Sequence, residues 1–431
     1  MKLLDGVVRP YAWGSRTAIA SLRQKPVPSP HPEAELWFGA HAEGPATVLG
    51  SDGGVQGDLL ELIDDDPQRA LGAASIDQFG ARLPLLLKVL AADEPLSLQA
   101  HPSAEQAREG FAREEAAGVP IDAPTRNYKD ASHKPELIVA ISEFDALAGF
   151  RDPARTIDLL RELQVRELDP YLGMLVGQPD AEGLRAVFTT WLTLPESSLR
   201  TVVPAVLSGA VDALNAGSQF APELRTALEL GEIYPNDPGV LASLLLNRIH
   251  LSPNEGLYLP AGVLHAYLSG TGVEIMANSD NVLRGGLTPK HIDVPELLRV
   301  LDFAPVDVGD LTPRMRTVGA ERIYVTPAPE FRLSRVELEG TGLHQPSSIC
   351  FDMPGPQILA TLGGTIEVRL PGDPPLAVSS GYAVWIPDGD PDVVVRASSS
   401  RALFFRARVP VSDPDGSVHA RASAVQTPPT L

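Results

Sequence analysis

The sequence predicts a mainly β protein with a helical domain inserted into it. Three features of the 431-residue chain predict this fold class. Short apolar runs broken by Gly and Pro fill the N-terminal third, as expected for β strands separated by turns. Between about Pro153 and His250, leucines recur every three to four residues, which is the period of amphipathic helices. From Leu251 the short-run texture returns and continues to about Val409.

Local signals place the first elements along the chain. The apolar runs Ala34 to Ala40 and Leu83 to Leu90 predict strands. Helices are expected near Leu59 to Leu71 and near Ser103 to Ala117. The second helix has a recognisable start, because a Pro-Ser pair is followed by acidic residues in the first turns.

A weak internal echo predicts two copies of one β module. The segment Gly256 to His265 is similar to Gly381 to Asp392, since each has a strand followed by Pro-x-Gly-x-x and a ligand-type residue. Asp392 replaces His265 in the second copy, which also lacks an upstream Gln-x-His, so that module is predicted to hold no metal. The expected domains are a metal-binding β domain (1–152 and 250–310), a helical domain (153–249), a C-terminal β domain (311–409) and a disordered tail (410–431).

Composition limits the partners and the compartment. A net charge of -20 argues against nucleic-acid binding, which needs clustered Lys and Arg. The single cysteine, Cys350, excludes an internal disulfide framework and any thiolate-rich zinc site, and it fits a reducing cytoplasm. No signal-peptide pattern is present, and no apolar run approaches the roughly 18 residues that span a bilayer. We expect a cytoplasmic monomer without membrane or nucleic-acid partners.

Three short motifs predict one metal site. They are Gln-Ala-His-Pro at 99–102, His-Lys-Pro-Glu at 133–136 and Pro-Ala-Gly-Val-Leu-His at 260–265. Gln99, His101, Glu136 and His265 supply two imidazoles, a carboxylate and an amide oxygen, a set that suits one Zn²⁺ per chain. With room left for a substrate oxygen, this is a catalytic rather than a structural composition. The Pro-x-Gly-x-x-His motif itself resembles the second motif of the cupin superfamily, a double-sheet jelly roll.

A longer match is more specific. The segment His265 to Lys290 resembles the signature of type I mannose-6-phosphate isomerases, and blocks at Tyr11 to Ser15, Ala34 to His41 and Leu83 to Glu136 agree in order. The resemblance covers roughly residues 1 to 305. It implies a catalytic cupin-type jelly roll, a helical domain and a second jelly roll. It places the zinc ligands of the family on the four residues named above and its active-site arginine on Arg284.

Two departures from the family pattern are small. Gly285 stands where Ala is usual after the arginine, and Ser132 stands where Asn often precedes His-Lys-Pro-Glu. Neither change removes a reactive group, so the resemblance still implies an active site.

The resemblance implies interconversion of mannose 6-phosphate and fructose 6-phosphate through a cis-enediol, which feeds mannose and GDP-mannose precursor metabolism. A hydride mechanism is disfavoured, because no Gly-x-Gly-x-x-Gly motif for a nicotinamide cofactor occurs. Lys134 is the first choice of base, since a residue two before Glu136 on a strand points to the same side. Glu274 and a zinc-bound water are the alternatives, and Lys134 could instead only bind substrate oxygens.

The phosphate needs cations and hydrogen-bond donors. Arg284, Lys88, Lys290 and Ser97 are the family-matched candidates. Lys88 lies in an apolar run and could instead form a structural ion pair, while Arg284 could steady enediolate charge. Two other classes remain open: a catalytically silent sugar-phosphate binding protein, and a metallo-cupin with oxidative chemistry.

Overall fold

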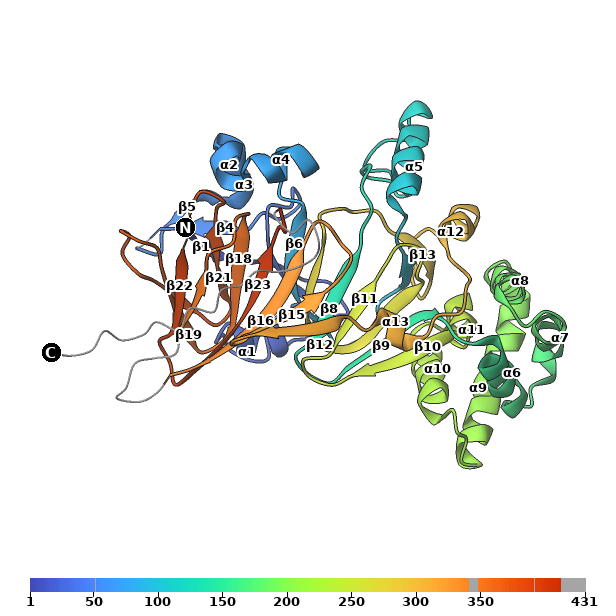
Figure 1. Ribbon diagram of the computed structural model, residues 1–431. Helices are drawn as coiled ribbons and strands as arrows, with labels where there is room; N and C mark the ends of the chain where they lie inside the picture. The colour runs from blue at the N-terminus through green and yellow to red at the C-terminus, as the bar shows by residue number, and fades with distance from the viewer. Residues whose placement is uncertain (51, 341–347, 391, 412–431) are drawn as a thin grey trace. The chain divides into compact units, whose positions relative to one another are not determined.

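The computed structural model describes residues 1–50, 52–340, 348–390 and 392–411. The chain divides into two compact units. Unit 1 comprises Met1–Ala91, Gly272–Asn278 and Pro313–Leu431, and unit 2 comprises Ala92–Thr271 and Ser279–Thr312. Strands dominate unit 1, whereas unit 2 combines strands with most of the helices (Figure 1). The predicted fold class, mainly β with a helical region, is confirmed.

Unit 1 contains a nine-stranded sheet that joins the two ends of the chain. Strand β1 pairs antiparallel with β21, so that Leu3 lies opposite Val384. Its strands, in spatial order, are β14 (Arg314–Val318), β15 (Glu321–Val325), β16 (Arg332–Glu339), β23 (Arg401–Arg408), β18 (Gln357–Gly363), β21 (Tyr382–Ile386), β1 (Lys2–Asp5), β4 (Thr47–Leu49) and β5 (Val55–Asp58).

The rest of unit 1 consists of further strands and four short helices. A four-stranded sheet has the order β17 (Ser348–Phe351), β22 (Val393–Ala397), β19 (Thr365–Arg369) and β20 (Leu376–Ser379). Strands β6 (Leu85–Ala92), β3 (Glu35–Phe38) and β2 (Val7–Arg9) pair in that order. The helices are α1 (Ala18–Leu22), α2 (Leu59–Asp65), α3 (Pro67–Leu71) and α4 (Ala73–Phe79).

Both predicted helical interruptions are present. The expected helix near Leu59 to Leu71 is two helices, α2 and α3, and α2 begins with a capping box between Asp58 and Glu61. Helix α5 (Ala104–Ala116) of unit 2 also begins with a capping box, in which Ser103 and Gln106 bond each other's backbone.

Unit 2 contains seven of the described strands, three of which carry a predicted metal ligand: β7 carries Gln99, β8 carries Glu136 and β12 carries His265, while His101 follows β7. The seven are β7 (Leu98–Ala100), β8 (Glu136–Ala140), β9 (Phe144–Phe150), β10 (Leu246–Leu251), β11 (Gly256–Leu259), β12 (His265–Ala277), which continues into unit 1, and β13 (Leu283–Gly286). Its remaining helices are α6 (Pro153–Glu162), η1 (Arg166–Leu168), α7 (Asp169–Gly177), α8 (Ala181–Leu192), α9 (Glu196–Asn215), α10 (Ala221–Ile233), α11 (Pro238–Ser243), α12 (Val294–Val300) and α13 (Val308–Leu311).

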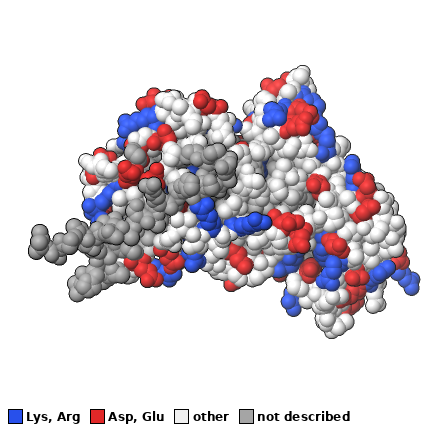
Figure 2. Space-filling view, in the orientation of Figure 1, with Lys and Arg blue, Asp and Glu red and all other residues white. Residues whose placement is uncertain are grey.

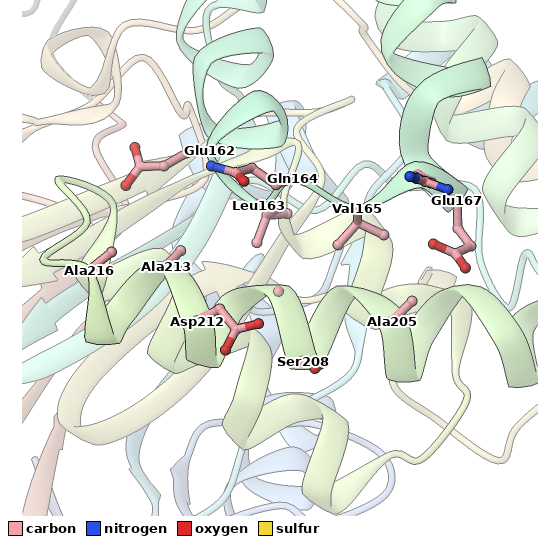
Figure 3. A pocket seen from close by; sticks show the side chains of 12 residues that line it. Glu162, Leu163, Gln164, Val165, Glu167, Ala205, Ser208, Asp212, Ala213 and Ala216 are labelled. Carbon is pink, nitrogen blue, oxygen red and sulfur yellow. The ribbon is translucent and has the colours of Figure 1, made fainter.

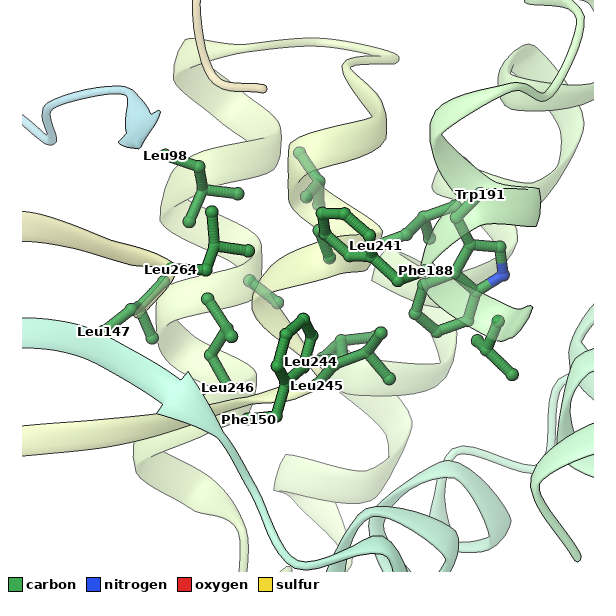
Figure 4. Close-up of a cluster of buried hydrophobic side chains, with 14 of the residues drawn as sticks. Leu98, Leu147, Phe150, Phe188, Trp191, Leu241, Leu244, Leu245, Leu246 and Leu264 are labelled. Carbon is green, nitrogen blue, oxygen red and sulfur yellow. The ribbon is translucent and has the colours of Figure 1, made fainter. Parts of the chain in front are cut away.

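A hydrophobic core joins the helices of unit 2 to these strands. Phe188 and Trp191 of α8 belong to the same buried cluster as Leu98 of β7 and Leu264, which precedes β12 (Figure 4). Since side chains alternate across a strand, burying Leu98 and Ala100 in this core turns Gln99 to the opposite face. Leu264 and Ala266 likewise direct His265 away from the helices.

Several expectations stay predictions. These are the jelly-roll character of the β modules and the boundaries of the four expected domains. Most of the expected tail, from residue 412, lies outside the described residues. In the described part of the chain, no helix is both long and apolar enough to cross a bilayer. Basic and acidic side chains are interspersed on the face shown in Figure 2.

Candidate metal centre

The centre is built on a row of three side chains across adjacent strands of unit 2. Gln99 of β7 lies opposite His265 of β12 on one side and opposite Arg284 of β13 on the other. Residues directly opposite in antiparallel strands project from the same face of the sheet. The three polar side chains therefore share the face opposite the helical core.

The carboxylate of Glu136 lies close to both histidines of the site. His101 Nε2 lies 3.2 Å from Glu136 Oε1, and His265 Nε2 lies 3.6 Å from Glu136 Oε2. The ligand atoms of the three residues lie within 4.8 Å of one another. His101 Nε2, His265 Nε2 and Glu136 Oε2 are buried and make no hydrogen bond to any described residue. Such buried polar atoms are costly unless something binds them, so the three residues fit a metal ion.

Backbone carbonyls set the tautomer of both imidazoles. His101 Nδ1 donates to the carbonyl oxygen of Asn281 at 2.7 Å, and His265 Nδ1 donates to that of Val263 at 2.9 Å. A carbonyl oxygen can only accept, so Nδ1 carries a proton in each ring, and in the neutral ring Nε2 keeps a free lone pair. This is the arrangement in which a histidine binds a metal through Nε2.

Electrostatics favour the metal-binding protonation states. Burial lowers the pKa of His101 below 6.5, which favours the neutral imidazole. Burial by itself would raise the pKa of Glu136, but the attraction of His101 in its protonated form and of Lys134, together with hydrogen bonds from His101 and His265, outweighs it and holds the pKa well below its usual range. Lys134 Nζ lies 3.4 Å from Glu136 Oε1. Lys134 precedes β8 rather than lying on it, yet its amine reaches the ligand set as expected.

Two cations, Arg284 and Lys129, act on a third, Lys290, and Arg284 lies opposite the predicted ligand Gln99. Burial lowers the pKa of Lys290, and the charges of Arg284 and Lys129 lower it further. Burial also lowers the pKa of Arg284. An anion would offset the charges of Arg284 and Lys129 that act on Lys290, so these three residues fit a phosphate.

The remaining predicted site residues have different surroundings. In unit 1, Lys88 is buried, with its Nζ 3.5 Å from Glu35 Oε1 and 3.4 Å from Glu274 Oε2. The ring of Trp37 lies 5.1 Å from the same amine. The ion pair that the sequence left open for Lys88 is thus present, and Glu274 is one of its partners. Ser97 is half-buried and immediately precedes β7.

Glu105, four residues after His101, lies in the first turn of α5. It is not among the three residues whose ligand atoms converge.

Sequence reasoning missed Asn281, whose side chain is fully buried and whose carbonyl holds His101. It lies inside the matched segment His265 to Lys290, but one asparagine carries no spacing signal that would single it out. It also missed a groove of about 640 Å³ between the 162–167 turn and α9 (Figure 3). Three acidic residues (Glu162, Glu167 and Asp212) and Arg166 line this groove together with apolar and small residues, and none of the predicted site residues does.

Comparison with known proteins identifies the family. The chain is 40% identical over 358 residues to the mannose-6-phosphate isomerase of Escherichia coli, which covers 82% of this chain and 89% of that protein. The chain belongs to the mannose-6-phosphate isomerase family. The human mannose-6-phosphate isomerase is 31% identical, with 94% of this chain and 97% of that protein covered. Residues 1–153 match the family described as phosphomannose isomerase type I, catalytic domain.

Solved structures of the mannose-6-phosphate isomerase family share the fold. A zinc-bound mannose 6-phosphate isomerase superimposes with a TM-score of 0.84 at 34% identity, covering 95% of this chain and 99% of the other. A mutant of the phosphomannose isomerase from Salmonella typhimurium gives a TM-score of 0.85, also at 34% identity.

Proposed function

We propose that this chain is a zinc-dependent aldose–ketose isomerase that interconverts mannose 6-phosphate and fructose 6-phosphate. One observation carries the proposal: the unbonded ligand atoms of His101, Glu136 and His265 converge on one point, in a chain of this family. The alternative of a silent binding protein explains the cations but gives no reason for a ligand set of this kind.

The ligand set suits the chemistry of isomerisation. His101, Glu136 and His265 would hold the zinc ion, with Gln99 on the same face as the fourth ligand. Bound there, zinc supplies Lewis acidity that stabilises negative charge on the sugar oxygens. The imidazoles are presented as lone-pair donors by their Nδ1–H bonds, and the ionised Glu136 offsets the charge of the metal.

We assign the proton transfer between C1 and C2 to Lys134. Moving one proton between neighbouring carbons through a cis-enediol needs a single base beside the reacting carbons. The amine of Lys134 is buried and lies next to the ligand Glu136. Glu274, the alternative base, is already paired with Lys88 in unit 1.

The phosphate is assigned to the cation group. Arg284 offers a planar fork of donors. Lys290 adds a second positive charge, and because the charges of Arg284 and Lys129 destabilise it, a bound anion would stabilise it. Ser97 and Lys88 remain further candidates for phosphate contacts. Arg284 also lies opposite Gln99, so steadying enediolate charge is its alternative role. A cytoplasmic monomer that supplies mannose 6-phosphate for GDP-mannose precursors completes the proposal.

A coupled assay tests the proposal. Fructose 6-phosphate formed from mannose 6-phosphate is measured with purified protein before chelation, after chelation and after Zn²⁺ is restored. We expect activity to disappear with the metal and to return with it, and Lys134→Ala to lose turnover while binding one zinc ion per chain. Absence of turnover in the zinc-loaded protein would reject the isomerase, and wild-type turnover in Lys134→Ala would reject that base.

A further inference from the structure

A buried asparagine connects two loops that lead to the metal centre. Asn281 is fully buried in unit 2, between β12 and β13. Its side-chain oxygen accepts from the backbone N–H groups of Lys129 at 2.8 Å and Asp130 at 3.3 Å. Its side-chain nitrogen donates to the carbonyl oxygens of Asp130 and Ser132, both at 2.8 Å. One amide thereby satisfies four backbone groups of the 129–132 loop.

The network has a second member, Asp130. Its carboxylate accepts from Ser279 Oγ at 2.9 Å, from the backbone N–H of Asp280 at 2.9 Å and from that of Ser132 at 2.8 Å. The 129–132 and 279–281 loops are therefore bonded to each other in both directions. Each donor and acceptor restricts the relative position of the two loops, since a buried polar group that loses its partner costs free energy.

Both loops lead directly to the metal centre. The 129–132 loop continues into Lys134 and Glu136, and the 279–281 loop continues into Arg284. The carbonyl of Asn281 itself accepts the Nδ1–H bond of His101. Asn281 is thus linked to four functional side chains, Lys134, Glu136, Arg284 and His101, although it belongs to none of the ligand motifs.

We propose that Asn281 is the positioning residue of this centre: its side-chain amide fixes the carbonyl that orients His101 and holds the loop that delivers Lys134 and Glu136. Partners of metal-binding histidines that lie beyond the ligands set the ring orientation, and their loss typically lowers metal affinity or activity by about 10–100-fold. This role rests on the proposed function, because it presumes a metal at the three ligands.

The test compares three variants with the wild type. Asn281→Ala removes the four backbone contacts of the amide and its contact with the Asp130 carboxylate. Ser279→Ala removes a hydroxyl that donates to Asp130 and to the carbonyl of Ser132 and accepts from the N–H of Asn281. Asn278→Ala is the matched control, because its side chain donates to the carbonyl of Leu83 at 3.3 Å, in unit 1. Zinc affinity is measured by competition with a chromophoric chelator, and Co²⁺-loaded protein is studied by visible absorption, which reports ligand geometry.

For Asn281→Ala we expect zinc affinity about 10–100-fold below wild type, a changed Co²⁺ spectrum and a lower kcat with KM within about twofold. Ser279→Ala should shift affinity in the same direction by less, and it carries the test if Asn281→Ala does not fold. Asn278→Ala should retain wild-type affinity. Wild-type zinc affinity and Co²⁺ spectrum in a folded Asn281→Ala, or equal losses in the control, would overturn the inference. Failure of the wild type to bind zinc would instead reject the proposed function.

Discussion

Replacing Lys88 by methionine should be strongly destabilising. The amine of Lys88 is buried between two carboxylates, at 3.5 Å from Glu35 and 3.4 Å from Glu274. At these distances each attraction is worth about 5 kcal/mol at an effective dielectric constant of about 20, before desolvation is subtracted. Methionine keeps most of the volume but leaves two buried carboxylates without the lysine charge. Breaking a buried pair by removing one partner costs about 3–5 kcal/mol, and we expect a loss of that size.

The assay is urea unfolding followed by tryptophan fluorescence, since Trp37 contacts the amine and bonds Glu35 through its indole N–H at 2.7 Å. Lys2→Met is the control, because that lysine is exposed and donates to the side chain of Gln56 rather than to a carboxylate. Adding Glu274→Gln to Lys88→Met should recover at least about 1 kcal/mol, because it removes one of the two carboxylate charges that lose the attraction of the lysine.

Two results would refute this reasoning. One is a loss below about 1 kcal/mol in Lys88→Met, the size of an exposed ion pair. The other is unchanged stability combined with a KM for mannose 6-phosphate raised more than about tenfold, the signature of lost substrate binding. That outcome would assign Lys88 to the phosphate rather than to its ion pairs.

Two further predictions concern helix packing and a titrating surface group. Gly110→Ala in α5 should destabilise although alanine is the better helix former by about 1 kcal/mol, because the added Cβ would lie 2.3 Å from Cε2 of the buried Tyr128 and overpacking costs about 1–3 kcal/mol. Gly173→Ala in α7, where a Cβ would meet no described atom within 4 Å, should stabilise, and a stabilised Gly110→Ala would contradict the close approach of Tyr128. His250 should titrate above 6.5 by NMR, since its hydrogen bond to Asp145 raises its pKa and Glu143 adds to this. Its contribution to stability is therefore present below pH 6.5 and is lost as pH rises through the folded pKa; a pKa at or below 6.5 would be inconsistent with these contacts.

The part of the site that the sequence predicts is the part carried by local spacing. His101, Glu136 and His265 stand in short motifs, and strand alternation then turns them to one face. The start of α5 at Ser103 is predictable for the same reason, because a capping box involves residues only three apart. Lys134 shows the limit of this reasoning. Its spacing from Glu136 predicts a position on the same strand, but β8 begins at Glu136, where pairing with Leu259 of β11 begins.

Long-range polar contacts were beyond prediction. The partners of Lys88 are Glu35 and Glu274, and those of Asn281 lie about 150 residues earlier in the chain. A lysine in an apolar run indicates that a partner exists, but it does not identify which carboxylate is the partner. A single asparagine does not even indicate a buried partner, because the same residue type occurs in turns, caps and buried networks.

The ligand geometry depends on apolar packing as much as on polar contacts. On β7 and at the start of β12, the residues flanking Gln99 and His265 lie in the core formed with α8 and α11, and on β13 Leu283 does the same beside Arg284. Because neighbouring side chains on a strand point to opposite faces, turning one to the other face of the sheet also moves its neighbours off their own face. Releasing Gln99 or His265 from the metal face would therefore require withdrawing Leu98 or Leu264 from a close-packed core, which costs several kcal/mol. The helical region thus stabilises the orientation of Gln99 and His265, although it contributes no ligand itself.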